Sequence, residues 1–150
     1  MIAIEKGRTE LAKTLIANGA DTNAIIPPGN TDGWSGYTPL MIAADRGHTE
    51  LAKILIEKGA NVDTSLDNTA SSYHGFTPLM IAIARRDIQI VSTLLENNAD
   101  ISKQNPAGEN ALAIAKRLGN REIIDAIKTY TPQTYPTSHI DLIPTARYID

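Results

Sequence analysis

The same six residues, Thr-Pro-Leu-Met-Ile-Ala, occur twice in this chain, at Thr38–Ala43 and again at Thr77–Ala82. Self-similarity at a fixed spacing is typical of a repeat architecture, in which one small unit stacks against copies of itself. Such a unit cannot bury its apolar face alone, so neighbouring units build the core together. We therefore expect the function to lie on the surface of an array rather than in a deeply buried pocket.

Each unit carries the pattern of two helices separated by a short turn. A proline at the first helical position, as at Pro39, favours a helix start because no hydrogen bond is lost and its φ is already helical. A glycine such as Gly47 then interrupts the chain, and a second segment follows with apolar residues on one face of a 3.6-residue helix. These apolar positions are Leu11, Ala12, Leu15 and Ile16; Leu51, Ala52, Leu55 and Ile56; Ile90, Val91, Leu94 and Leu95; and Ile123, Ile124 and Ile127.

These residues resemble the ankyrin repeat, a unit of about 33 residues with a β-turn, two antiparallel helices and a Thr-Pro-Leu-His-x-Ala motif. The matching segments are 36–40, 47–48, 59–63, 75–79 and 98–101. The resemblance implies an all-α solenoid of stacked helix–turn–helix units. It also implies a structural role for His48, as a hydrogen-bonding group between adjacent units.

The pattern divides the chain into an array over residues 1–130 and an extended, proline-containing tail over residues 131–150. Within the array we expect a partial repeat at 1–23, repeats at about 36–63 and 75–102, and a variant C-terminal repeat at 108–130. Met1 aligns with Met41 in the middle of a helix. This start fits either a fragment of a longer protein or a native half repeat that leaves Leu15 and Ile16 exposed.

Some positions depart from the repeat pattern. Met41 and Met80 replace the histidine of the motif. Arg86-Asp87 stands where the second unit has Gly47-His48, so we expect an altered turn between the helices of the third unit. In the fourth unit Asn110-Ala111 replaces Thr-Pro, which predicts a weaker helix start there.

Composition excludes several classes of function. The net charge of −3 argues against a nucleic-acid surface, because such domains are usually clearly basic. The chain has no cysteine, which excludes disulfides, thiol catalysis and cysteine metal sites. No apolar run approaches the roughly 20 residues that span a bilayer, and the N-terminus lacks the pattern of a signal peptide. We expect no cofactor, no metal, no membrane or nucleic-acid partner, and a cytoplasmic location.

The sequence offers little for catalysis. The histidines His48, His74 and His139 lie in separate contexts, and no Gly-x-Ser-x-Gly motif or Gly-rich phosphate loop is present. We therefore predict that this chain is not an enzyme.

Two of the loops between units are longer than the third. Residues 24–36 (finger 1) and 64–75 (finger 2) span 13 and 12 residues, whereas residues 103–108 span 6, the usual length in ankyrin repeats. Insertions in solenoids fall on one face, which is often the binding face. Long exposed loops also cost little free energy, so neutral drift is the alternative.

The fingers carry residue types that are enriched at protein interfaces, including the single tryptophan, Trp34. The alternative for Trp34 is that it packs back onto its own loop. We expect alanine at Trp34 and Tyr73 to weaken partner binding and to leave stability nearly unchanged. The predicted partner-binding residues are Ile25, Ile26, Trp34, Tyr37, Arg46, Tyr73, His74, Phe76 and Arg85.

Three cations occupy the same position in successive units, near the end of each first helix: Lys6, Arg46 and Arg85. Stacking would place them in a row that suits an acidic partner. The alternative is that each cation complements the negative end of its helix, which is worth about 0.3–1 kcal/mol. Glu5 and Asp45 lie beside the row and dilute its field.

The resemblance implies a protein–protein interaction module that binds another protein through its concave face and the finger loops. The alternative is an ankyrin targeting region of a larger enzyme or secreted effector. We expect a monomer, with self-association through the incomplete first repeat as the other possibility.

Overall fold

The computed structural model describes residues 1–29 and 33–130. The expected tail over 131–150, with His139, lies outside the described residues. Within the described part the chain forms eight helices and no strand. They are α1 (Ile2–Glu5), α2 (Thr9–Ala17), α3 (Pro39–Arg46), α4 (Thr49–Glu57), α5 (Pro78–Arg85), α6 (Ile88–Glu96), α7 (Ala111–Leu118) and α8 (Arg121–Thr129).

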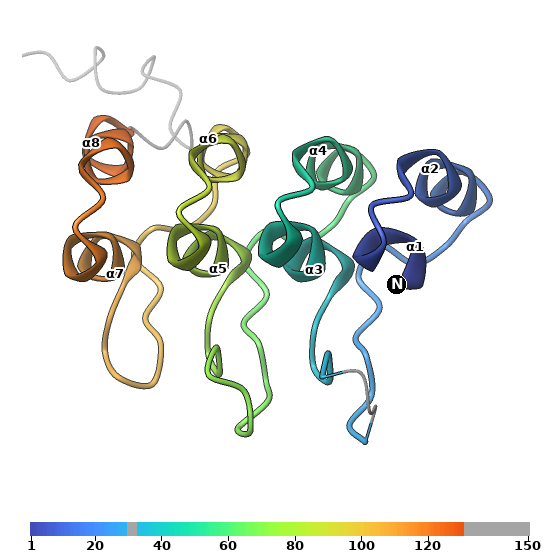
Figure 1. The fold of residues 1–150 in the computed structure, drawn as a ribbon, viewed down its shortest axis with the longest axis horizontal. Coiled ribbons are helices and arrows are strands. Elements are labelled where there is room, and N and C mark those ends of the chain that lie inside the picture. The colour runs from blue at the N-terminus through green and yellow to red at the C-terminus, as the bar shows by residue number, and fades with distance from the viewer. Residues whose placement is uncertain (30–32, 131–150) are drawn as a thin grey trace, which may run out of the picture.

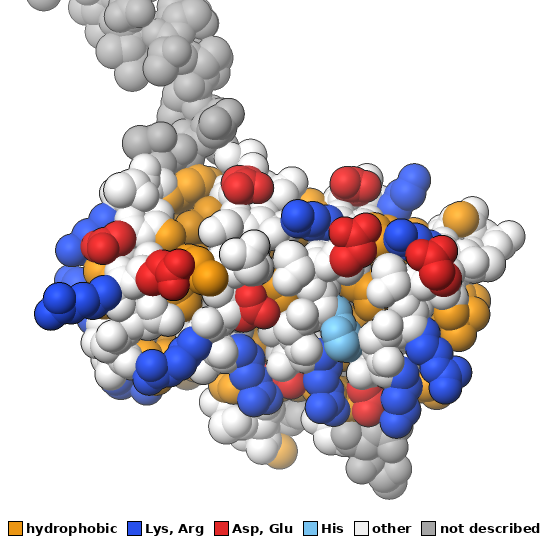
Figure 2. All heavy atoms as spheres, turned by 45° about the horizontal axis from the view of Figure 1, so that its top comes forward, with side chains coloured by type: hydrophobic (Ala, Val, Ile, Leu, Met, Phe, Trp, Pro, Cys, Tyr) orange, Lys and Arg blue, Asp and Glu red, His pale blue; other side chains and the backbone are white. Residues whose placement is uncertain are grey.

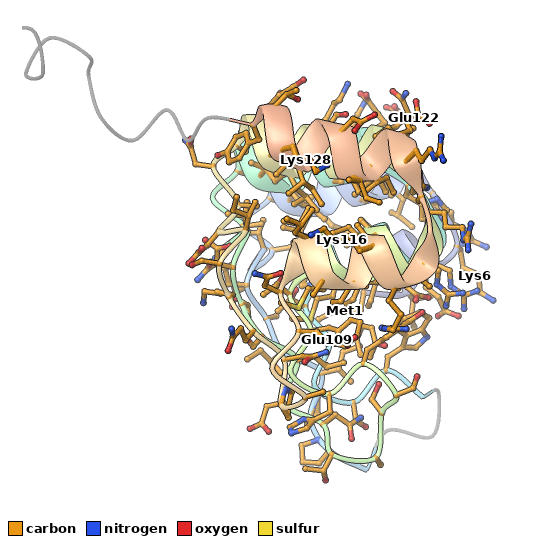
Figure 3. All side chains as sticks on the ribbon, turned by 90° about the vertical axis from the view of Figure 1, so that its left-hand side faces the viewer. Met1, Lys6, Glu109, Lys116, Glu122 and Lys128 are labelled. Carbon is orange, nitrogen blue, oxygen red and sulfur yellow. The ribbon has the colours of Figure 1, made fainter. Side chains whose placement is uncertain are left out.

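The helices form antiparallel pairs that stack in a single row (Figure 1). Viewed along the stack, the outer helices α2, α4, α6 and α8 make one layer and the inner helices α1, α3, α5 and α7 make a second (Figure 3). The loops between units project together beyond the inner helices (Figures 1 and 3). The predicted all-α solenoid with two elongated loops is confirmed.

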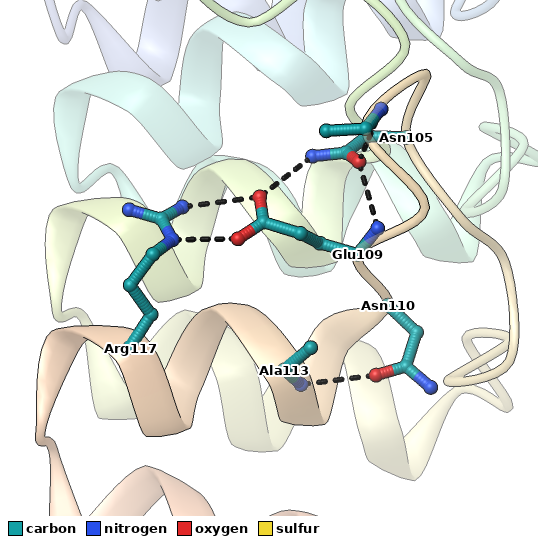
Figure 4. A network of polar contacts seen from close by, with 6 residues as sticks. Asn105, Glu109, Asn110, Ala113 and Arg117 are labelled. Atoms are coloured by element: carbon teal, nitrogen blue, oxygen red, sulfur yellow. Dashed lines mark hydrogen bonds and ion pairs between the residues drawn. The ribbon is translucent and has the colours of Figure 1, made fainter.

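Side-chain caps explain where the inner helices begin. The hydroxyl oxygens of Thr38 and Thr77 accept hydrogen bonds from the backbone N–H of Met41 and Met80, each at 3.3 Å. In the fourth unit the side-chain oxygen of Asn110 accepts from the N–H of Ala113 at 2.9 Å (Figure 4). Asparagine is at least as good a cap as threonine. The expected weaker helix start in the fourth unit is therefore wrong.

The turns between inner and outer helices share one backbone conformation. Gly47 and Gly119 adopt left-handed φ values of 75° and 68°, and Arg86 adopts 61° at the same position. An altered turn in the third unit was expected from Arg86 and is not found. The guanidinium of Arg86 donates to the carbonyl of Leu118 at 2.9 Å. This bond to the next unit offsets part of the strain that a non-glycine residue carries there.

His48 packs between units rather than bonding between them. A methyl group added at Gly7 would lie 2.9 Å from Cε1 of His48, so the imidazole rests on the glycine of the preceding unit. Its buried Nε2 has no hydrogen-bond partner among residues 1–29 and 33–130. His48 thus has a structural role, as expected, but it fills the space between the two units. The expected hydrogen bond is absent from this part of the chain.

The core is one continuous cluster that runs the length of the stack. Each inner helix contacts the next, α1 with α3, α3 with α5 and α5 with α7. The repeated Leu-Met-Ile segment supplies the contact, because Leu40, Met41, Leu79 and Met80 are fully buried. Leu and Met at these positions give each unit a flat apolar face on both sides, which only a neighbouring unit can cover.

The N-terminal end of the stack is the exception. The large exposed apolar side chains of the described residues, Ile2, Leu11, Leu15 and Ile25, all belong to the first unit or the loop that follows it. Leu15 is exposed as expected, whereas Ile16 is partly buried against the core. In Figure 2 hydrophobic side chains are visible at the end of the stack where α2 lies, and Lys and Arg side chains cover much of the opposite end. We call Ile2, Leu11 and Leu15 the apolar N-terminal face.

The loops between units lie close against one another. A methyl group at Gly36, the last residue of finger 1, would come within 2.9 Å of the Asp67 carbonyl oxygen in finger 2. At Gly75, the last residue of finger 2, it would overlap Pro106 of the third loop, only 2.2 Å from its Cδ. Both glycines also have a positive φ. They are therefore required for two reasons, backbone conformation and close approach.

We predict that Gly75→Ala lowers the free energy of unfolding by about 1–3 kcal/mol more than Gly59→Ala does. Both residues have positive φ, but an added methyl group at Gly59 meets no atom within 4 Å. The difference between the two variants, measured by urea denaturation, isolates the contact between loops. Equal losses would show that the loops do not press on one another.

Candidate functional site

The two fingers are closed by the same pair of backbone hydrogen bonds. In finger 1 the N–H of Ile26 donates to the carbonyl of Tyr37 at 3.0 Å, and the N–H of Gly36 donates to the carbonyl of Ile26 at 2.8 Å. In finger 2 Leu66 takes the part of Ile26, with both bonds at 2.8 Å. Ile26 and Leu66 are both buried. The base of each finger is therefore closed by two backbone hydrogen bonds around one buried apolar side chain.

A second bond joins the fingers to each other. The side-chain amide of Asn68 in finger 2 donates to the backbone carbonyl of Ser35 in finger 1 at 2.8 Å. Together with the close approach at Gly36, this bond fixes the spacing between the fingers.

Each finger contains an aromatic pair. Trp34 and Tyr37 meet edge to face with their ring centroids 4.9 Å apart. At the same positions in the next unit, Tyr73 and Phe76 are 5.2 Å apart and tilted. Such pairs add about 0.5–1.5 kcal/mol beyond the area they bury. Tyr37 is also buried, and this burial raises the pKa of its phenol above the ordinary value.

These aromatic side chains are more buried than the sequence suggested. Ile26, Tyr37 and Phe76 are buried, and Trp34 is only 9% exposed. Trp34 thus packs onto its own loop, as the alternative had it. The expectation that alanine at Trp34 leaves stability nearly unchanged rested on an exposed ring and is wrong.

An arginine from the inner helix covers an aromatic ring of each finger. The guanidinium carbon of Arg46 lies 4.9 Å from the centroid of the Trp34 ring. That of Arg85 lies 5.8 Å from the centroid of the Tyr73 ring. The cation row and the finger aromatics were separate observations in the sequence. The structure brings them together as one module, present in two successive units.

Each arginine also pairs with an acid of the preceding unit. Nη2 of Arg85 lies 2.6 Å from Oδ1 of Asp45, and its Nε donates to the same oxygen at 2.8 Å. This bond raises the pKa of Arg85 above the usual guanidinium value. The pair between Arg46 and Glu5 is longer, at 3.7 Å. The modules of successive units are thus tied to one another as well as to their own fingers.

The modules line a cleft of about 690 Å3 between the two fingers and the ends of α3 and α5, which we call the finger cleft. Trp34, Tyr37, Arg46, Tyr73 and Arg85, all predicted binding residues, contribute to its wall. Sequence reasoning missed the polar part of the lining. That part comprises Ser35, Asp45, Asn68, Ser71 and Ser72. The serines and Asn68 lie in the two inserts, which was their only signal in the sequence, and Asp45 was noted there only as an acid beside the cation row.

The remaining predicted residues lie elsewhere. Ile25 and Ile26 line a hollow of about 310 Å3 toward the N-terminal end, beside Met1 and Ile2. His74 lines a hollow of about 390 Å3 on the far side of finger 2, next to Pro106. Phe76 is buried beneath Tyr73. Trp34 lines both the first of these hollows and the finger cleft, so Ile25 and Ile26 adjoin the cleft. His74 lines a separate hollow and Phe76 is buried, so the nine predicted residues do not form one surface.

Lys6 has the same position in its unit as the two arginines, but it does not line the finger cleft. It lies at the edge of the stack, beside the turns that join inner and outer helices (Figure 3).

The fourth unit replaces the aromatic module with a polar one (Figure 4). Glu109 stands at the position of Tyr37 and Phe76 and makes two hydrogen bonds with Arg117, at 2.6 and 3.3 Å. Asn105 supports the same carboxylate at 3.0 Å. The carboxylate of Glu109 thus ties the short third loop to α7, and this loop carries no aromatic side chain. The finger cleft is confined to the two units whose loops are long.

Two general features of the described residues bear on function. Across residues 1–29 and 33–130 there is no group of three or more His, Asp or Glu side chains that could hold a metal ion. None of the helices in this part is long and apolar enough to cross a membrane.

Comparison with known proteins agrees with this architecture. The family model described as Ankyrin repeats (3 copies) matches residues 1–105, which is more than half of the chain. Helices α7 and α8 lie beyond the matched range and continue the same stack. A search of curated proteins found no match to this chain.

We predict that Trp34→Ala lowers the free energy of unfolding by about 3 kcal/mol, because it removes a buried ring that both Tyr37 and Arg46 contact. The matched control in the same finger is Ile25→Ala. Ile25 is 59% exposed, so its truncation should change stability by no more than about 0.5 kcal/mol. Thermal denaturation of the two variants checks this. Equal effects would contradict the burial of Trp34.

Proposed function

Since this chain belongs to the ankyrin repeat family, whose domains are generally protein-binding modules, we propose that it binds a protein partner in the finger cleft. The observation that carries this proposal is the repeated module of an arginine over an aromatic ring, Arg46 on Trp34 and Arg85 on Tyr73. Both modules open into the same cleft. Arginine and aromatic side chains are the residue types that most often dominate binding energy at interfaces.

The hydrogen bonds at the base of the fingers support the same proposal. Backbone bonds close each loop, and the bond from Asn68 to Ser35 fixes one finger against the other. A surface that is ordered before binding loses little conformational entropy when the partner arrives. The cleft volume of about 690 Å3 is ample for several side chains of a partner segment.

The concave side of the stack extends this surface. The loops project beyond the inner helices along one side of the molecule (Figure 1). A partner held in the finger cleft would therefore lie next to the C-terminal ends of α3 and α5, where Arg46 and Arg85 are exposed.

The test is to fill the cleft without changing its charge. Ala70 is exposed and lines the finger cleft, whereas its neighbour Thr69 is exposed and does not. We predict that Ala70→Trp weakens binding of a partner, isolated with the unmodified chain, at least tenfold. The matched control, Thr69→Trp, should bind as the unmodified chain does. Isothermal titration gives both affinities, and equal affinities for the two variants would rule out the cleft as the binding surface.

A second proposal concerns self-association, which the apolar N-terminal face favours. Leu11 and Leu15 lie exposed on α2, next to a hollow of about 230 Å3. At the other end of the stack, α8 exposes Glu122, Asp125 and Lys128. An apolar face matches another apolar face better than it matches this charged end. We propose that the apolar N-terminal face packs against the same face of a second copy of this chain, around a two-fold axis.

We predict that the unmodified chain dimerises as its concentration is raised, because the dimer covers the exposed apolar face, and that Leu15→Lys remains monomeric. Lys128→Leu at the opposite end serves as the control and should not alter the dimer. Light scattering over a concentration series measures the mass directly. A monomer at every concentration would exclude the dimer.

A further inference from the structure

The ion pairs in the finger cleft expose their cations and bury their acids. The side chain of Arg85 is 49% exposed, whereas its partner Asp45 is only 6% exposed. The side chain of Arg46 is 46% exposed and that of Glu5 is 24% exposed. A ligand entering the cleft therefore meets positive charge, although the chain as a whole is acidic.

Among residues 1–29 and 33–130, both guanidinium groups keep hydrogen-bond donors that no other side chain or carbonyl uses. A guanidinium has five N–H donors, and the bonds to Asp45 use those on Nε and Nη2 of Arg85. The distance of 3.7 Å between Arg46 and Glu5 is too long for a hydrogen bond. The aromatic rings hold the guanidinium groups in place, so their donors are oriented before a ligand binds.

Neutral donors surround the two cations. Ser35, Ser71 and Ser72 line the same cleft, and Asn68 joins them there. Their hydroxyl and amide groups suit the backbone of a bound peptide, which presents carbonyl oxygens at regular intervals. The cleft thus combines two fixed cations with donors for a main chain.

The repeat sets the distance between the two cations. Arg46 and Arg85 occupy the same position in units whose inner helices, α3 and α5, pack directly together. Packed helices lie about 8–10 Å apart. In a polyproline II segment, residues i and i+3 face the same side and are separated by about 9 Å. In a β-strand, same-side residues are separated by about 7 or 13 Å, and neither value fits.

We propose that the finger cleft recognises an extended, polyproline II-like segment of a partner protein that carries carboxylates at positions i and i+3, one for each arginine. This inference rests on the proposed function and adds the chemistry of the partner. The carboxylate of residue i bonds to the free donors of Arg46, and that of residue i+3 bonds to those of Arg85. Such charge-assisted bonds are about twice as strong as neutral ones.

The experiment uses the whole chain and three synthetic peptides. The first is Pro-Glu-Pro-Pro-Glu-Pro with blocked ends, the second has glutamine at both glutamate positions, and the third has its two glutamates at i and i+2. Binding is followed by the fluorescence of Trp34, which is the only tryptophan and lines the cleft. We expect the first peptide to bind at least tenfold tighter than either of the others, and its affinity to fall as salt is added.

Variants of the cation row complete the test. Arg46→Gln and Arg85→Gln should each weaken binding of the first peptide about tenfold. Lys6→Gln serves as the matched control, because Lys6 has the same position in its unit but lies outside the cleft, and it should bind normally. Arg46→Lys keeps the charge and should bind with intermediate affinity. Circular dichroism of each variant confirms that it is folded.

Equal binding of the glutamate and glutamine peptides would overturn this inference, and so would a loss of binding in Lys6→Gln as large as in the arginine variants. The proposed function is tested by a separate outcome. If Ala70→Trp blocks a natural partner while the peptides bind alike, the cleft remains the binding surface and only its preference for acids is wrong.

Discussion

The structure depends on one repeated contact, the burial of each unit's apolar face against the next unit. Leu40 and Met41 of α3 and Leu79 and Met80 of α5 are fully buried in this contact. Since the second and third units use the same residues, equivalent side chains in these units are related by nearly the translation that relates α3 to α5. This is why Arg46 and Arg85 open into one cleft. The contact that holds the fold together therefore also sets the spacing of the site.

The fingers add to this scaffold a rim whose base is held by hydrogen bonds. Holding a loop of a dozen residues in one conformation is costly, because each fixed residue loses roughly 1–2 kcal/mol of backbone conformational entropy. Here the buried aromatic pairs and the bond from Asn68 to Ser35 counter that loss. The aromatic residues are thus mainly supports, and the arginines that cover them line the cleft. The finger cleft therefore presents charged groups at its surface and apolar side chains beneath them.

Local patterns in the sequence were sufficient to predict the fold, but they were not sufficient to predict how the site is built. Thr38, Pro39 and Gly47 mark helix ends through interactions with their own neighbours, so the helices and their register could be predicted. The burial of Trp34 remained one of two alternatives, because part of the cover over its ring comes from Arg46, which belongs to another element. Arg86 shows the same limit, since its left-handed conformation is supported by the carbonyl of Leu118 in the next unit. Contacts between units decide these details, and a single unit's sequence does not contain them.

The central claim is that the finger cleft is the surface on which a partner lies. Amide hydrogen exchange of the whole chain, free and bound to an isolated partner, tests it most directly. The account predicts slower exchange on binding in the backbone of residues 34–37 and 70–73, with little change in α2 and α8. Protection confined to α2 or α8, with the fingers exchanging as they do in the free chain, would contradict it.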